Sequence, residues 1–92
     1  MTKYEAAMIF SVANGDEATK ALVEKFNALI AENGAIENVD DWGKRRLAYL
    51  IDDEAEGYYV FFEFESEPTF PAELERIAKI TDGVLRVMVI KK

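Results

Sequence analysis

The pattern at residues 58–65 restricts the possible folds of this chain more than any other feature of the sequence. Val60, Phe62 and Phe64 occupy alternate positions, and Phe61 stands between the first two. Side chains of a β-strand point alternately to the two faces of a sheet, so these three residues are predicted to share one face. Aromatic and β-branched residues also favour strands. The segment is therefore predicted as a strand with one strongly apolar face.

Two amphipathic helices are predicted, one before and one after this strand. Between Ala18 and Ile30, apolar residues recur at the spacing of one helical face, and Gly34 follows as a stop. Pro68 and Pro71 end the strand and open the second helix, because proline is tolerated in a first helical turn. The apolar stripes of both helices can cover the apolar face of a sheet.

Three further strands are predicted at residues 3–12, 35–51 and 85–91. Gly43 is expected to mark a bulge or bend, and residues 52–57 are expected to form a polar hairpin loop. The order β-α-β-β-α-β favours an α+β fold of the ferredoxin-like type, a sandwich in which a four-stranded antiparallel sheet carries both helices on one face. With 92 residues and no linker or repeat, residues 1–92 are expected to form one domain.

The sheet face without helices, the open face, is predicted to bind a partner. Alternation assigns to the core face Ala6, Met8, Phe10, Val60, Phe62, Phe64, Val87 and Val89. It assigns to the open face Ile9, Tyr59, Phe61, Arg86, Met88 and Ile90. A sheet face exposed to water is normally polar, so these apolar residues indicate a surface that another molecule covers. Ordinary cross-strand stabilisation of the sheet is the alternative explanation.

The composition excludes most catalytic chemistry. The chain has no cysteine and no histidine, which removes thiol nucleophiles, thiolate metal sites and the catalytic arrangements that depend on imidazole. Glu63 and Glu65 share an exposed strand face and are interpreted as solubilising residues rather than as an acid/base pair. The chain is therefore predicted not to be an enzyme, and no metal or cofactor is expected.

The charge distribution singles out one short segment. Eleven basic residues stand against 18 acidic ones, a net charge of −7 that opposes binding to polyanions through the overall field. Residues 44–46, Lys-Arg-Arg, are the only run of three basic residues. In such an acidic chain, this run is the predicted place for a phosphate backbone. Since no apolar run approaches the roughly 18 residues of a membrane span, the chain is expected to be soluble and cytosolic.

Three segments resemble one known family. Residues 41–51, Asp-Trp-Gly-Lys-Arg-Arg-Leu-Ala-Tyr-Leu-Ile, resemble the signature of the bacterial small-subunit ribosomal protein six family: glycine, two or three basic residues, leucine-alanine-tyrosine, proline and isoleucine. Tyr4 and Glu5 match the family near its start, and residues 80–91 match its closing block. Leu50 departs from the pattern, since the family usually has proline there.

This resemblance implies a ferredoxin-like fold and a non-catalytic role on the ribosome in the cytoplasm. The family binds the central domain of small-subunit ribosomal RNA as a heterodimer with small-subunit protein eighteen. Together with the basic run, the resemblance gives as predicted RNA contacts Lys3, Lys44, Arg45, Arg46 and Arg86. The residues predicted to face the protein partner are Tyr59, Phe61, Met88 and Ile90.

A second class of function is the alternative. The same fold serves regulatory domains that bind a small metabolite as a homodimer. Such a domain needs a polar, glycine-rich pocket between its subunits, whereas this chain offers a basic run beside an open apolar sheet face. The two hypotheses thus differ in the surface that they require.

Overall fold

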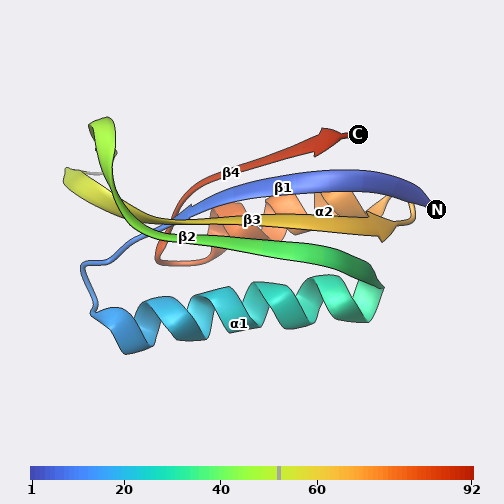
Figure 1. The fold of residues 1–92 in the computed structure, drawn as a ribbon, viewed down its shortest axis with the longest axis horizontal. Helices are drawn as coiled ribbons and strands as arrows, with labels where there is room; N and C mark the ends of the chain where they lie inside the picture. Colours follow the sequence, from blue (N-terminus) through green and yellow to red (C-terminus); the bar gives the residue numbers. More distant parts are fainter. Residues whose placement is uncertain (52) are drawn as a thin grey trace.

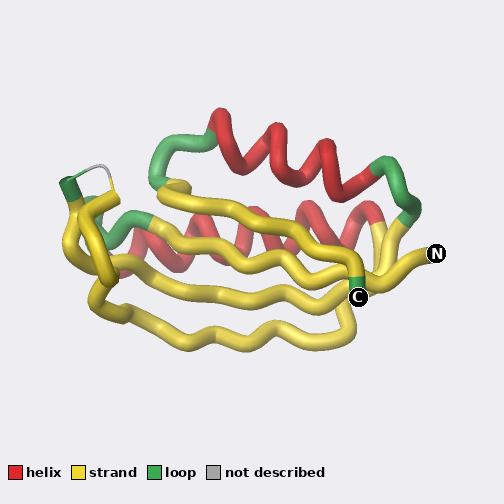
Figure 2. Tube along the Cα trace, turned by 90° about the horizontal axis from the view of Figure 1, so that it is seen from above, coloured by secondary structure: helices red, strands yellow, loops and turns green. Residues whose placement is uncertain are grey.

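A computed structural model describes residues 1–51 and 53–92 of the chain. Its elements are β1 (Thr2–Phe10), α1 (Asp16–Asn33), β2 (Gly34–Ile51), β3 (Glu54–Ser66), α2 (Phe70–Ile80) and β4 (Val84–Lys91). The strands form one antiparallel sheet in the order β2-β3-β1-β4. Both helices lie on the same side of this sheet (Figure 1), and Figure 2 shows that the two chain ends lie at the same end of it. The predicted βαββαβ arrangement is confirmed.

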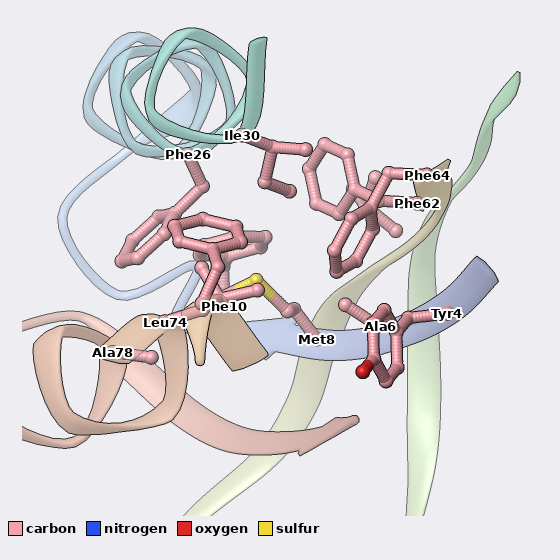
Figure 3. Packing of buried hydrophobic residues seen from close by; sticks show 12 residues of the cluster. Tyr4, Ala6, Met8, Phe10, Phe26, Ile30, Phe62, Phe64, Leu74 and Ala78 are labelled. Carbon is pink, nitrogen blue, oxygen red and sulfur yellow. The ribbon is translucent and has the colours of Figure 1, made fainter. Parts of the chain in front are cut away.

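The strand register explains why one sheet face is buried. Ala6 of β1 lies opposite Phe62 of β3, and Met8 lies between Val60 of β3 and Val87 of β4, so the side chains of each row share one face. The helices pack on this face, and close packing of their apolar stripes excludes water from it. Figure 3 shows the resulting cluster, which is made of Tyr4, Ala6, Met8, Phe10, Phe26, Ile30, Val60, Phe62, Phe64, Phe70, Leu74 and Ala78.

The predicted extent of the loop, residues 52–57, is wrong. The strand β3 begins at Glu54, and its pairing with β2 joins Glu54 to Ile51 and Glu56 to Arg46. Acidic side chains do not prevent this pairing, because the ladder is built from backbone groups and the side chains can point to solvent. Asp52, which the expected loop includes, lies outside the described residues.

The irregularity expected at Gly43 is confirmed. The pairing of β2 with β3 shifts between Asp41 and Gly43, and Gly43 has a φ of 76°, a backbone conformation that glycine adopts without a steric penalty. Trp42 is the extra residue of this bulge.

Candidate functional site

The centre of the open face is apolar and aromatic. Phe61 lies in its middle and meets the ring of Trp42 at an angle of 61°, with 4.8 Å between the ring centroids. The indole nitrogen Nε1 of Trp42 donates a hydrogen bond to Oδ2 of Asp40, at 3.0 Å, which fixes the orientation of the indole. Met88 is 55% exposed and Ile90 is 50% exposed. Tyr59 lies opposite Ile9, which is also on the open face. All four residues predicted to face the protein partner thus lie on this face.

Trp42 belongs to this surface, although it is not among the residues predicted to lie on the open face. It is 47% exposed, and it lies two residues after Asp40, which is opposite Phe61, so strand alternation places its side chain on the open face. Alternation along β2 was the available signal, but it assigns a face only once the register of β2 against β3 is known.

The three residues of the basic run do not form one patch. Arg45 lies opposite Gly57, a residue of the open face, whereas Lys44 lies opposite Tyr58 on the helix side. Arg46 lies opposite Glu56, one position further along the strand. Adjacent residues of a strand point to opposite faces, so the run divides between the two sides of β2. Only Arg45 of the three is on the open face.

Lys44 instead borders a groove between β2 and the start of α1. This groove has a volume of about 250 Å³ and is also lined by Asp16, Thr19, Lys20 and Tyr58. The hydroxyl of Tyr58 donates a 2.7 Å hydrogen bond to Oδ2 of Asp41. This hydrogen bond, followed by burial, raises the pKa of Tyr58 from 10.0 to about 12. The groove thus has both signs of charge in its lining, from Asp16 on one side and from Lys20 and Lys44 on the other.

The tip of the β2–β3 hairpin folds over the open face. There the guanidinium of Arg86, on the edge strand β4, lies 5.4 Å from the centroid of the Tyr49 ring, on the opposite edge strand β2. Figure 1 shows the end of β2 curling away from the helix side of the sheet here. Leu47, two residues before Tyr49 in this hairpin, is buried. The contact therefore joins β2 and β4, which are separated in the sheet by β3 and β1.

Two features hold this hairpin in place. A Cβ atom built on Gly57 would lie 2.5 Å from Cγ2 of Ile9 and 3.3 Å from Cδ2 of Leu47, so only glycine leaves room for the close approach. At the start of β3, Oγ of Ser11 donates a 2.7 Å hydrogen bond to Oε1 of Glu54, which ties the hairpin to the segment after β1. Contacts of Leu47 in β2 and of Glu54 and Gly57 in β3 thus hold both strands of the hairpin in place.

The opposite end of the open face is acidic. Lys3 forms an ion pair with Glu37, at 3.4 Å, and Lys92 forms one with Glu63, at 3.1 Å. Glu5 lies directly opposite Glu63, and Lys3 lies opposite Glu65. Because Glu65 and Gly57 are eight residues apart along β3, Lys3 is separated from Arg45 by about 27 Å.

The open face is therefore graded in charge along its length. Arg45 and Arg86 lie at the hairpin end, aromatic and aliphatic side chains fill the centre, and carboxylates gather near the two chain ends. The structure brings together two of the five predicted RNA contacts on this face and leaves Lys3 at the other end. The open face thus presents cations, apolar side chains and carboxylates in three successive zones.

Two further observations concern metal sites and membrane-spanning helices in the part of the chain that the structure describes. No three aspartate or glutamate side chains in it come together as a set that could hold a metal ion. No helix in it is both long and apolar enough to cross a membrane.

Comparisons with known proteins agree with this geometry. The family model of ribosomal protein S6 matches residues 3–91. The small ribosomal subunit protein bS6 of Clostridium novyi is 50% identical over 91 residues, which cover 98% of this chain and 96% of the relative. That of Thermoanaerobacter pseudethanolicus is 52% identical over 92 residues, 99% of this chain and 97% of the relative. The crystal structure of the 30S ribosomal protein S6 from Thermotoga maritima superposes with a TM-score of 0.92 at 28% identity, covering 99% of this chain and 87% of that one.

Proposed function

Because this chain belongs to the ribosomal protein S6 family, we propose that it is a structural constituent of the small ribosomal subunit that binds small-subunit ribosomal RNA together with small-subunit protein eighteen. It acts without catalysis, in the cytoplasm, by the complementarity of its surface to two partners. The observation that supports this most directly is the graded open face. A charged end and an apolar centre on one face suit a nucleic acid and a protein that lie next to each other.

The protein partner covers the centre of the open face. Trp42 and Met88 are about half-exposed in this chain alone, and the partly buried ring of Phe61 lies against Trp42. Aromatic side chains and methionine are enriched in the cores of protein interfaces. Exposed apolar area of this kind is stabilised when a second surface removes it from water.

The RNA lies at the hairpin end of the same face. Arg45 and Arg86 point to it there, and Lys44 and Arg46 flank them on the other side of β2. Arginine suits phosphate because its planar guanidinium donates several hydrogen bonds in a fixed geometry. Lys3, at the far end, is a separate predicted contact that reaches RNA only if the RNA extends along the whole sheet.

The net charge of −7 weakens RNA binding by this chain alone, so the protein partner should strengthen it. At long range the chain repels phosphate, and only a few of its cations are grouped. A partner that already holds the RNA brings the backbone within reach of Arg45 and Arg86. Binding is therefore cooperative between the two proteins.

The test is a titration of a central-domain fragment of small-subunit ribosomal RNA with this protein, with protein eighteen, and with their mixture. The mixture should bind the fragment at least about tenfold more tightly than this protein alone, which corresponds to about 1.4 kcal/mol of coupling. Equal affinity with and without the partner, or no binding by the mixture, would contradict the proposal. A ribosomal RNA fragment from the large subunit serves as the control for sequence-independent binding.

A further inference from the structure

We propose that Tyr49 and Arg86 together form a stacking site for an unpaired RNA base at the hairpin end of the open face. This inference rests on the proposed function, because it specifies how the RNA is held there. It adds Tyr49, which is not among the predicted RNA contacts, to the RNA-binding surface. It also gives Arg86 a second role besides neutralising phosphate.

The contact between the two side chains provides the platform. The guanidinium of Arg86 lies over the Tyr49 ring, 5.4 Å from its centroid, so two flat π-systems meet at this point. Tyr49 is nevertheless 57% exposed, and Arg86 is exposed as well. Much of the surface of this pair is therefore open to solvent. Unpaired bases stack on tyrosine rings and on guanidinium planes, and each base stacked on an aromatic residue contributes substantially to affinity.

The hairpin holds the platform in position before any RNA arrives. Leu47 is buried two residues before Tyr49, and the close approach of Gly57 to Ile9 lets the strand fold over the sheet. The hydrogen bond from Ser11 to Glu54 anchors the other strand of the hairpin. A preformed site loses less conformational freedom on binding than a mobile loop would.

The surroundings favour RNA over a protein as the ligand of this pair. Arg45 lies on the same face and the same end, so a phosphate of the stacked nucleotide or of its neighbour has a cation within reach. The apolar centre with Phe61 and Trp42 lies further along the sheet, toward the chain ends. A protein contact at Tyr49 is an outcome that the test distinguishes.

The test uses the heterodimer with protein eighteen and the central-domain RNA fragment, and compares Tyr49→Leu with Tyr49→Phe. Tyr49→Leu should weaken RNA binding by about tenfold, in the range reported for the loss of one stacked base, whereas Tyr49→Phe should keep it within about twofold. Arg86→Lys retains the charge but loses the flat guanidinium, so it should also weaken binding. Leu50→Ala, at the next residue along the strand, is the matched control and should leave the affinity unchanged.

The dependence of affinity on salt separates stacking from charge. Stacking releases no counterions, so Tyr49→Leu and Arg86→Lys should lower the affinity while leaving the slope of log affinity against log salt unchanged. A flatter slope in Tyr49→Leu would overturn the inference, since Tyr49 would then only position Arg86 on a phosphate. Equal losses in Tyr49→Phe and Tyr49→Leu would overturn it as well.

Three more outcomes separate this inference from the proposed function. If the wild-type heterodimer does not bind the RNA, the proposed function is wrong. If it binds and Tyr49→Leu binds equally well, only the stacking site is wrong. If Tyr49→Leu weakens the formation of the heterodimer rather than RNA binding, Tyr49 belongs to the protein interface and the inference fails. Thermal unfolding of each variant confirms that the fold is retained, and Arg86→Lys provides the second measurement if Tyr49→Leu does not fold.

Discussion

Phe61 and Phe62 are adjacent and chemically identical, yet the structure places their side chains on opposite faces of β3. Phe62 is fully buried against the helices, whereas Phe61 lies on the open face against the edge of Trp42. Truncating each to alanine therefore compares the two faces within one strand. The expected difference between the two variants follows from their surroundings alone.

Phe62→Ala should lower the free energy of unfolding by about 3–5 kcal/mol, because it removes a buried ring and leaves a cavity in a close-packed core. Phe61→Ala loses one aromatic pair, about 0.5–1.5 kcal/mol, and the partial burial of one ring on an exposed surface. We expect its total cost to be about 1–2 kcal/mol. Phe61→Ala should in turn weaken binding to the protein partner by about 2 kcal/mol, close to thirtyfold in affinity, as the loss of a packed aromatic anchor does.

Urea denaturation, followed by circular dichroism, measures the stability of both variants, and isothermal titration with protein eighteen measures binding by Phe61→Ala. The chain contains one tryptophan, so the emission of Trp42 should also change in Phe61→Ala and stay unchanged in folded Phe62→Ala. If Phe61→Ala costs as much stability as Phe62→Ala while binding the partner normally, the assignment of the two faces is wrong.

Three other predictions test separate features of the structure. Gly57→Ala should lower the free energy of unfolding by about 1–3 kcal/mol through overpacking against Ile9. Adding Ile9→Ala should recover part of this loss. Purely additive effects of the two substitutions in urea denaturation would contradict the close approach of Gly57 to Ile9. Tyr58 has a folded-state pKa of about 12, above its ordinary value of 10.0, so its contribution to stability is complete below pH 10 and is lost between pH 10 and about 12. The stability of wild-type protein should therefore fall more steeply over that range than that of Tyr58→Phe, and parallel curves would refute the hydrogen bond. Arg45→Ala should flatten the slope of log RNA affinity against log salt by up to about 0.9. Lys25→Ala, which removes the same charge from α1, should leave the slope unchanged. Equal changes in the two variants would contradict an RNA contact on the open face.

The fold could be predicted because its main signals are local. The alternation of Val60, Phe62 and Phe64 fixes which face of β3 is buried, and a shift of one residue would expose all three. Gly34 does end the first helix, and Gly43 does mark a bulge. The predicted hairpin loop failed because its acidic composition resembles a loop, while strand pairing depends on backbone groups that any residue supplies.

The arrangement of the candidate site could not be predicted in the same way. The basic run looks like one patch in the sequence, but strand alternation divides it, and only Arg45 joins Arg86 on the open face. The contact of Trp42 with Phe61 depends on the register of β2 against β3, and the contact of Tyr49 with Arg86 depends on a hairpin that folds back. The folded hairpin requires the close approach of Gly57 to Ile9 and Leu47, which lie in separate parts of the sequence.

Sedimentation with small ribosomal subunits tests the central claim most directly. Tagged wild-type protein, expressed in a bacterium that lacks its own copy of the family, should sediment with the small subunit through a wash at moderate salt. Arg45→Ala combined with Arg86→Ala should be released at lower salt than wild type, while Lys25→Ala should behave as wild type, because only the first two residues lie on the surface proposed for RNA. Wild-type protein that stays at the top of the gradient, away from small subunits, would contradict the account.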